Sequence, residues 1–257
     1  MDNLGRTVFM LRRVLELLSR RRVLKRRLPR DVGGASIFVS PDAQLKYLKP
    51  GKGAFDRELL AIAKDYLGSQ SNVWDIGANV GVFTFAAASL VGKGKILAVE
   101  ADIWLAQLIS RSVLLNKKRE YNITVLPVAI SDQVGVASFM IAARGRASNA
   151  LRSAGGNSMM GGVRQICTVP TLTLDILLNK TFKPDFVKID VEGAEKMVLN
   201  GAGKTLSSAR PVFYIEVNAS NCDDVTHIFR YYHYKLVDGC TGAPIDRCTD
   251  NSLAFPE

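Results

Sequence analysis

Short runs of apolar residues alternate along most of the chain with segments whose apolar residues recur every three or four positions. The first pattern is typical of buried strands, and the second is typical of helices that cover them. Strands that alternate with helices in this way predict an α/β fold with an open, mostly parallel sheet and helices on both faces. We predict strands at residues 72–76, 95–100, 123–130, 186–189, 212–217, 234–237 and 253–255, and helices at 56–67, 81–91, 103–116, 172–178, 194–206 and 223–232.

Two further strand pairs are predicted outside this alternation. Residues 35–39 form a short apolar run, which we pair in a hairpin with residues 44–48. Residues 136–141 predict a strand that pairs with residues 167–169. Both pairs would add β structure beside the main sheet.

The periodicity fails between residues 142 and 165. A stretch of this length without periodicity inside a compact domain is usually functional or disordered. We interpret residues 142–165 as a substrate lid, with a floppy insertion as the alternative. Its arginines would suit an anionic group on the acceptor, or they would simply keep the loop soluble. They are Arg144, Arg146, Arg152 and Arg164.

Residues 1–30 carry a different pattern, which we treat as a basic amphipathic arm ahead of one domain at residues 31–257. The arm holds ten basic and two acidic residues, so it carries +8 of the net charge of +10. Three roles stay open: a helix docked on its own domain or poorly ordered, a membrane-surface helix that binds anionic lipid, and an arm that binds nucleic acid. Its apolar residues recur at helical spacing at Leu4, Val8, Leu11, Leu15 and Leu18.

Composition narrows the class of protein. The hydrophobic fraction of 47% and the charged fraction of 23% are ordinary globular values, which excludes a disordered or collagen-like chain. No run of about 18 uncharged apolar residues occurs, so we expect no membrane-spanning helix. We expect a cytoplasmic protein without a signal peptide, with peripheral membrane association through residues 1–30 as a further possibility. The four cysteines form no C-x-x-C pair and there are two histidines, so we predict no metal site.

A glycine-containing turn follows the first predicted strand of the alternation, in the segment DIGANVG at residues 75–81. Gly77 would let the backbone approach a ligand, Gly81 would let the helix pack on the strand, and Asn79 tolerates a positive φ. A dinucleotide fingerprint would need glycines at positions 79 and 82, which are Asn79 and Val82, so we do not expect NAD.

An acidic residue at the end of the next strand completes the signal. Glu100 lies 23 positions after Gly77, where a carboxylate can accept hydrogen bonds from both ribose hydroxyls. A glycine turn and this acid without phosphate-binding features indicate a nucleoside that carries no pyrophosphate. S-adenosylmethionine is the common one, and Asp75 would meet its positively charged methionine end.

The segments DIGANVG (75–81), AVE (98–100), AISD (129–132), TLD (173–175), KIDVEGAE (188–195) and IEV (215–217) together resemble the FkbM family of S-adenosylmethionine-dependent methyltransferases. The resemblance spans roughly residues 70–220. It implies the class I methyltransferase fold, with a seven-stranded, mostly parallel sheet and one antiparallel strand. It also implies S-adenosylmethionine as the cofactor and O-methylation of a small molecule or glycan.

The resemblance also assigns residues to parts of the cofactor. Glu100 would hold the ribose beside Ala101 and Asp102, and Ser131 and Asp132 would border the adenine. Asp190, Glu192 and Gly193 would lie next to the transferred methyl group. The methionine and loop side would be lined by Asp75, Gly77, Asn79 and Gly81.

The chemistry of O-methylation calls for a base, because a sugar hydroxyl is a poor nucleophile until it loses its proton. A positioned base typically contributes ~10²–10⁴-fold. The best candidates are the carboxylates at strand ends, Asp190, Glu192 and Glu216. Asp190 and Glu192 are two residues apart, so in extended chain they point the same way. We favour a metal-free base over a divalent metal shared with Glu216.

Each of these residues also has a plainer interpretation. Glu192 could cap the helix that starts near residue 194. We interpret Lys188 as a structural partner of a carboxylate and Glu195 as a solvated helix residue. His227 and His233 are expected to be structural.

Two other functions compete with O-methylation of a saccharide or small molecule. One is an RNA methyltransferase that uses the basic arm. We do not expect nucleic acid as the partner, because residues 31–257 carry only +2 and lack a D/N-P-P-Y type motif. The other is a non-catalytic binding protein with a degenerate cofactor pocket, but no motif is broken. The sequence leaves the oligomeric state open.

Overall fold

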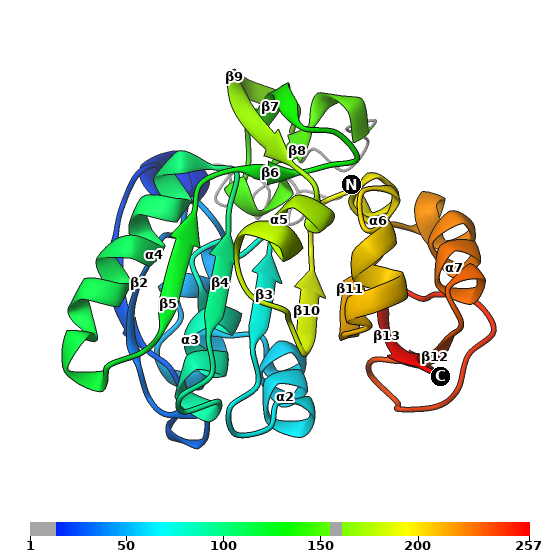
Figure 1. The fold of residues 1–257 in the computed structure, drawn as a ribbon. Coiled ribbons are helices and arrows are strands. Elements are labelled where there is room, and N and C mark those ends of the chain that lie inside the picture. The colour runs from blue at the N-terminus through cyan, green and yellow to red at the C-terminus, as the bar shows by residue number, and fades with distance from the viewer. Residues whose placement is uncertain (1–13, 155–160) are drawn as a thin grey trace.

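The structure is a computed structural model that describes residues 14–154 and 161–257. Its main sheet contains β3 (Val73–Ile76), β4 (Ile96–Val99), β5 (Ile123–Leu126), β10 (Phe186–Ile189), β11 (Val212–Glu216), β12 (Tyr234–Asp238) and β13 (Asn251–Pro256). The strand order is β12-β13-β11-β10-β3-β4-β5 (Figure 1). β13 runs antiparallel to both of its neighbours, and the other pairs are parallel. The predicted mostly parallel seven-stranded sheet with one antiparallel strand is confirmed.

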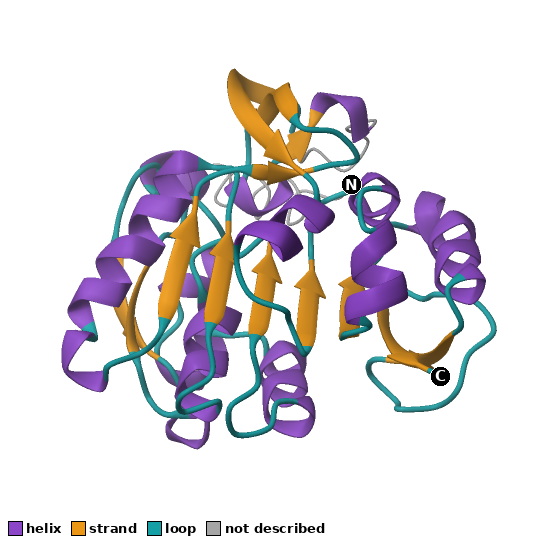
Figure 2. Cartoon of the chain, viewed as in Figure 1, coloured by secondary structure: helices purple, strands orange, loops and turns teal. Residues whose placement is uncertain are grey.

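Helices cover both faces of this sheet (Figure 2). They are α2 (Arg57–Tyr66), α3 (Val82–Leu90), α4 (Ile103–Leu115), α5 (Leu174–Lys180), α6 (Glu195–Asn200) and α7 (Cys222–Tyr231). Side chains alternate between the faces of a strand. In β3, Val73 therefore joins the core under α2, α3 and α4, whereas Trp74 and Ile76 join the core under α5, α6 and α7.

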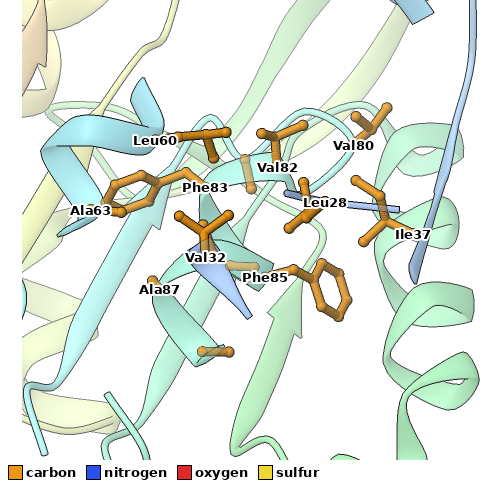
Figure 3. Close-up of a cluster of buried hydrophobic side chains, with 14 of the residues drawn as sticks. Leu28, Val32, Ile37, Leu60, Ala63, Val80, Val82, Phe83, Phe85 and Ala87 are labelled. Carbon is orange, nitrogen blue, oxygen red and sulfur yellow. The ribbon is translucent and has the colours of Figure 1, made fainter. Parts of the chain in front are cut away.

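The N-terminal hairpin differs from the prediction. β2 (Ser36–Val39) pairs antiparallel with β1 (Leu24–Arg27), which lies inside the predicted arm, and not with residues 44–48. The connection turns back because Gly33 adopts a φ of 80°, and Leu45–Leu48 forms a 3₁₀ turn instead of a strand. The hairpin belongs to the domain, because Leu28 and Ile37 lie in the same apolar core as α3 (Figure 3).

Two predicted elements are interrupted. The predicted strand at 123–130 is split into β5 and β6 (Ala129–Ile130), because Pro127 has no N–H to donate to a ladder. The predicted helix at 194–206 ends at Asn200, and a separate helical turn follows at Thr205–Ala209. Between them the chain passes so close to the end of β6 that a Cβ on Gly201 would lie 2.5 Å from the carbonyl oxygen of Ser131.

A small second sheet stands over the carboxyl ends of the main sheet (Figure 1). It contains β6, β7 (Gly135–Ala142), β8 (Ala150–Leu151) and β9 (Val163–Leu172), in the order β6-β9-β7-β8. β7 and β9 are antiparallel, with Phe139 opposite Cys167, which confirms the predicted pair. The part of residues 142–165 that the structure describes consists of the end of β7, short 3₁₀ turns, β8 and the start of β9. Residues 155–160 lie outside the described residues, as do Leu4, Val8 and Leu11 of the arm.

Across residues 14–154 and 161–257, no helix combines the length and the apolar character needed to cross a lipid bilayer.

Candidate active site

The strands of the main sheet end in a row of functional residues. The register aligns the last paired residues of β11, β10, β3 and β4 at the same level. At that edge lie Glu216, Asp190, Gly77 and Glu100. Neighbouring strands are about 4.8 Å apart, so the row spans about 14 Å. Ligands of open α/β sheets bind at such carboxyl edges.

Three connected hollows follow this row. The main cavity encloses about 580 Å³ and lies between the β3 and β4 loops and the small sheet. The central pocket, of about 640 Å³, lies between the β3 loop and residues 44–59. The acidic groove, of about 440 Å³, follows the ends of β10 and β11. Asp190 and Glu192 line all three, so these two residues stand where the hollows meet.

The main cavity combines an apolar interior with the carboxylate of Glu100. Glu100 is 7% exposed, and its carboxylate accepts hydrogen bonds from the backbone N–H groups of Asn79 (2.7 Å) and Asp102 (2.8 Å). Burial raises the pKa of Glu100 to about 8, and repulsion from Asp102 adds to this against the two N–H groups. The apolar lining consists of Ile76, Val99, Leu105, Val128, Ile130, Phe139 and Leu151.

The β3 loop is shaped by positive φ angles at Gly77 (78°), Asn79 (54°) and Gly81 (85°), which confirms the expectation for Asn79. A Cβ on Gly77 would lie 1.8 Å from the carbonyl oxygen of Asp190. Glycine is therefore required here for close packing against the end of β10, in addition to the predicted approach of a ligand. A Cβ on Gly81 would lie 3.2 Å from Phe85 of α3 itself and 3.4 Å from Ile109 of α4, so its close contacts are with helices and not with the strand as predicted. Gly77 and Asn79 line the main cavity, whereas Gly81 is not among its lining residues.

Asn79 also presents an atom without a partner. Its side-chain oxygen is buried and accepts no hydrogen bond from any residue that the structure describes. The same side chain lines both the main cavity and the central pocket. A buried acceptor without a donor costs stability, so this oxygen marks a position where a bound ligand can supply an N–H or O–H.

Asp75 lies beneath the loop and not in the cavity. Its side chain is fully buried, accepts a hydrogen bond of 2.5 Å from the Thr84 hydroxyl, and lies 3.3 Å from Lys188 Nζ. Asp75 and Lys188 are opposite each other on β3 and β10, so the register makes the pair. The structure therefore corrects the expectation that Asp75 meets a ligand directly.

Lys188 joins three parts of the site. Besides Asp75, its ammonium donates to the carbonyl oxygen of Gly77 (3.1 Å) and lies 3.3 Å from the carboxylate of Asp190. Burial lowers the pKa of Lys188, but Asp190 and Asp75 outweigh burial and raise it overall. Lys188 is thus a permanently charged structural cation, as predicted.

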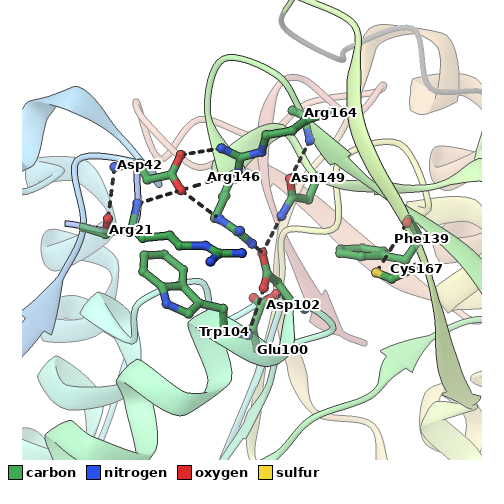
Figure 4. Close-up of polar contacts among 12 residues, drawn as sticks. Arg21, Asp42, Glu100, Asp102, Trp104, Phe139, Arg146, Asn149, Arg164 and Cys167 are labelled. Carbon is green, nitrogen blue, oxygen red and sulfur yellow. Dashed lines mark hydrogen bonds and ion pairs between the residues drawn. The ribbon is translucent and has the colours of Figure 1, made fainter. Parts of the chain in front are cut away.

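Asp102 is also withdrawn from the cavity, into a buried polar network (Figure 4). Its side chain is 3% exposed, caps α4 through the Trp104 N–H (3.0 Å), and accepts from Asn149 (2.8 Å) and from Arg146. Through its backbone N–H it orients Glu100, so it acts as a positioning residue. Its neighbour Ala101 lines the main cavity.

Arg146 is the centre of this network, and sequence reasoning did not single it out. Its guanidinium pairs with Asp102 and with Asp42 (3.1 Å), and it lies 4.8 Å from the Trp104 ring centroid (Figure 4). The Arg146 side chain is 8% exposed, and the residue lines the main cavity together with Asn149. Ion pairs of Arg146 therefore attach the small sheet to the edge of the main cavity.

The other arginines of residues 142–165 pair with acidic side chains of the chain or are exposed to solvent. Arg164 binds Asp42 (3.0 Å), and its hydrogen bond, with that of Arg146, lowers the pKa of Asp42 although burial acts in the opposite direction. Arg144 pairs with Glu16 (2.8 Å), and Arg152 is exposed. Arg144, Arg146 and Arg164 thus each pair with a carboxylate of the chain, and an anionic acceptor stays a prediction.

The residues after β5 that line the main cavity precede the two that the resemblance assigns to the adenine. Val128, Ala129 and Ile130 line this cavity, whereas Ser131 and Asp132 are not among its lining residues. The Ser131 N–H donates to Leu172 and its hydroxyl donates to Asp132 (3.0 Å), so both residues continue the small sheet.

The candidate catalytic carboxylates lie close together beyond the β3 loop. Asp190, Glu192 and Glu216 all line the central pocket and the acidic groove. Burial and the charges of Asp190 and Glu216 raise the pKa of Glu192 to about 8. Burial and the charge of Asp190 raise the pKa of Glu216 to about 7. Both groups therefore change protonation state near neutral pH.

Glu192 and Glu195 differ from their plainer interpretations. Glu192 has a φ of 50° and does not cap α6, whose N-cap residue is Ala194. Glu195 is 1% exposed, not solvated, because its carboxylate accepts from the Gly193 N–H (2.6 Å) and from Asn221 (2.6 Å). Glu195 thus holds the turn that presents Glu192. The positive φ of Glu192 is strained for a non-glycine residue. Such conformations persist where the surrounding structure enforces them, often at functional sites.

Among the described residues, no group of three or more His, Cys, Asp and Glu side chains is arranged to hold a metal ion.

Comparison with known proteins places the chain. A protein-family model described as methyltransferase FkbM domain matches residues 75–236, more than half of the chain. The solved structures that match include the methyltransferase FkbM from Methylobacillus flagellatus KT, with 16% identity and a TM-score of 0.51. That alignment covers 74% of this chain but 44% of the other, so this chain matches less than half of its length. At such identity the likeness is one of fold.

Two further matches have lower TM-scores. The precorrin-6y C5,15-methyltransferase from Geobacter metallireducens GS-15 has 15% identity, a TM-score of 0.46 and coverage of 79% of this chain and 88% of that chain. The tRNA m1G37 methyltransferase of M. jannaschii has 16% identity, a TM-score of 0.46 and coverage of 91% and 54%. A search among curated proteins found no match.

Proposed function

The chain belongs to the FkbM methyltransferase family, and from this membership we propose that it transfers the methyl group of S-adenosylmethionine to a hydroxyl oxygen of a sugar or another small molecule. One observation carries the choice of acceptor. Carboxylates whose pKa values lie near neutrality stand beside the cofactor loop, where they suit the removal of a proton from a hydroxyl.

The main cavity suits the cofactor. Glu100 keeps free lone pairs after accepting two N–H groups, so it would hold the ribose hydroxyls. The unpartnered side-chain oxygen of Asn79 suits a donor from the methionine part, and the apolar lining suits the adenine ring. When bound, S-adenosylmethionine supplies an electrophilic methyl group.

This chain's own residues would then orient the acceptor and take its proton. We assign the base role to Glu192, because it lines the main cavity as well as the acidic groove and accepts no hydrogen bond from a described residue. Asp190 is already paired with Lys188, which fixes its direction. Glu216 stands next to Asp190 on β11 and raises the proton affinity of Glu192 by its charge.

The charges of the acidic groove support a neutral acceptor over RNA. Its lining includes Asp190, Glu192, Glu195, Glu216 and Asp250, and none of the described residues that line it is Lys or Arg. A phosphate backbone would be repelled there, whereas sugar hydroxyls can donate hydrogen bonds to carboxylates. Most of the net positive charge of the chain lies elsewhere, because residues 1–30 carry +8 of the net +10.

Calorimetry of the purified chain with S-adenosylmethionine and with S-adenosylhomocysteine tests the cofactor site. We expect micromolar binding that Glu100→Ala abolishes and that Asp224→Asn, an exposed carboxylate change on α7, leaves unchanged. A folded wild type that binds neither compound would contradict the proposal.

Transfer of a radiolabelled methyl group tests the acceptor class. The acceptors would be a panel of monosaccharides and their methyl glycosides, with unmodified transfer RNA in parallel. We expect an alkali-stable methyl ether on a saccharide and no label in the RNA. Label in the RNA alone would replace this proposal with the alternative function.

A further inference from the structure

The segment that leads into the domain exposes apolar side chains. Residues 14–18 are helical, and four of their five side chains are large and apolar. Their exposed fractions are 50% for Val14, 40% for Leu15, 54% for Leu17 and 64% for Leu18. Burying such side chains is favourable, so their exposure together on these helical residues marks a surface that meets an apolar phase or partner.

The charges of this segment are sorted between its two sides. Glu16, the only acid of residues 14–30, is turned inward, where its carboxylate binds the Arg144 guanidinium at 2.8 and 3.0 Å and its side chain is 9% exposed. The cations that follow remain exposed at Arg20, Arg21, Arg22, Lys25 and Arg27. The outward surface is therefore apolar at the helix and uniformly positive beyond it.

The positive surface continues onto the domain. Lys25 and Arg27 of β1 line a shallow hollow together with Lys118 and Arg119, which follow α4, and no acidic residue is among its described lining residues. Leu115 contributes to the same hollow, and its neighbour Leu114 is 72% exposed. Cations and exposed leucines thus occur together a second time, on a different element.

We propose that this surface, formed by residues 14–27 with Lys118 and Arg119, binds the surface of an anionic lipid bilayer. The leucines would enter the boundary between headgroups and acyl chains, and the arginines and lysines would contact lipid phosphates and acidic headgroups. Nucleic acid is the weaker choice, because a phosphate backbone offers the arginines a partner but leaves the exposed leucines in water. The inference does not depend on the proposed methyl transfer, since it needs neither cofactor nor acceptor.

Sedimentation of the full chain with lipid vesicles tests this surface. One set of vesicles contains phosphatidylcholine alone, and the other contains about one third phosphatidylglycerol, an anionic lipid. We expect binding to the anionic vesicles at least roughly tenfold tighter than to the neutral ones, and weaker binding as salt is added.

Two variants separate the two parts of the surface. Leu17→Ser combined with Leu18→Ser should weaken binding at least about tenfold even at low salt, because apolar contact is lost. Arg20→Gln, Arg21→Gln and Arg22→Gln together should weaken it about a hundredfold and remove most of the salt dependence. The matched control is Val134→Ser with Val136→Ser, which removes side chains that are 60% and 75% exposed at the start of β7 and should change nothing.

All these side chains are exposed, so the variants should melt at the wild-type temperature, and S-adenosylmethionine titration would show that the cavity is intact. Wild-type binding that is equal for neutral and anionic vesicles, or unchanged by the leucine substitutions, would overturn the proposal. Binding to polyuridylate without binding to vesicles would identify nucleic acid as the partner and would also overturn it.

Discussion

At the cofactor end of the cleft, each buried carboxylate is matched by donors. Glu100 accepts two backbone N–H groups, and Asp102 accepts from Arg146, Asn149 and the start of α4. At the proposed acceptor end, Asp190 pairs with the Lys188 ammonium, whereas Glu192 and Glu216 face neighbouring carboxylates, and burial and these charges raise their pKa values toward neutrality.

The difference separates two uses of the same functional group. Carboxylates with fixed hydrogen-bond donors keep one position and orientation, because moving them would break several hydrogen bonds at once. Carboxylates crowded against one another hold protons, because repulsion makes the ionised form costly. The first arrangement suits recognition of a ribose, and the second suits proton transfer.

Replacing the proposed base should reduce methyl transfer and leave cofactor binding unchanged. With Glu192→Gln we expect kcat to fall by ~10²–10⁴-fold, because the hydroxyl proton loses its acceptor. The measurement is methyl transfer at saturating S-adenosylmethionine to the acceptor found in the screen, beside calorimetry of cofactor binding. Asp224→Asn serves as the control. A loss of kcat of less than about threefold would assign the base role to another group.

The ion pairs of Arg146 with Asp42 and Asp102 should contribute to the free energy of unfolding. Arg146→Met leaves Asp42 and Asp102 buried with one counter-ion fewer, so we expect the free energy of unfolding to fall by about 3–5 kcal/mol. Urea denaturation measures this. Arg152→Met, at an exposed arginine of the same segment, should change the free energy of unfolding by less than about 0.5 kcal/mol. Equal effects of the two substitutions would contradict the role given to Arg146.

The pKa of Glu100 predicts how cofactor affinity depends on pH. Ribose hydroxyls donate to the ionised carboxylate, but burial raises the pKa of Glu100 to about 8 in the free protein. Below that pH a proton must leave on binding, so the Kd should rise about tenfold for each unit of pH decrease. Calorimetry between pH 6 and 9 measures this, and Glu100→Gln should bind weakly with no slope. A flat wild-type profile would show that Glu100 is already ionised.

Repulsion among Asp190, Glu192 and Glu216 should also lower the stability of the fold. The folded-state pKa of Glu192 is raised from 4.5 to about 8, so the charged form is disfavoured in the fold and the penalty grows as the pH rises through that window. Glu192→Gln should therefore stabilise the protein by about 1–2 kcal/mol at pH 9, after allowance for partial exposure, and by almost nothing at pH 4. Urea denaturation at the two pH values decides this, and a destabilised variant at pH 9 would refute it.

Much of the fold could be predicted because it follows from local pattern. The strands that end at Ile76, Val99 and Ile189 are short apolar runs, and their ends place Gly77, Glu100 and Asp190 at one edge by topology. The burial of Asp75 had a signal as well. It and Lys188 are opposite charges inside two apolar strands, and such charges in buried strands are expected to pair.

Other features depend on contacts that no local pattern encodes. Arg146 meets Asp42 and Asp102 across sequence separations of 104 and 44 residues, from a stretch without periodicity. Glu195 resembles a surface helix residue until the turn before α6 brings it to Asn221. The predicted hairpin partner of β2 was wrong for a similar reason. In β1, exposed basic residues alternate with partly buried residues, and three of its four residues are basic, so no apolar run indicated a strand.

Lys188 gives the two ends of the cleft a shared contact. One ammonium holds both the carbonyl oxygen of Gly77 on the β3 loop and the carboxylate of Asp190. We expect a ligand that tightens the loop also to restrict Asp190, and so to change the affinity at the other end of the cleft. Reciprocity would then require the acceptor to change the affinity for the cofactor by the same factor.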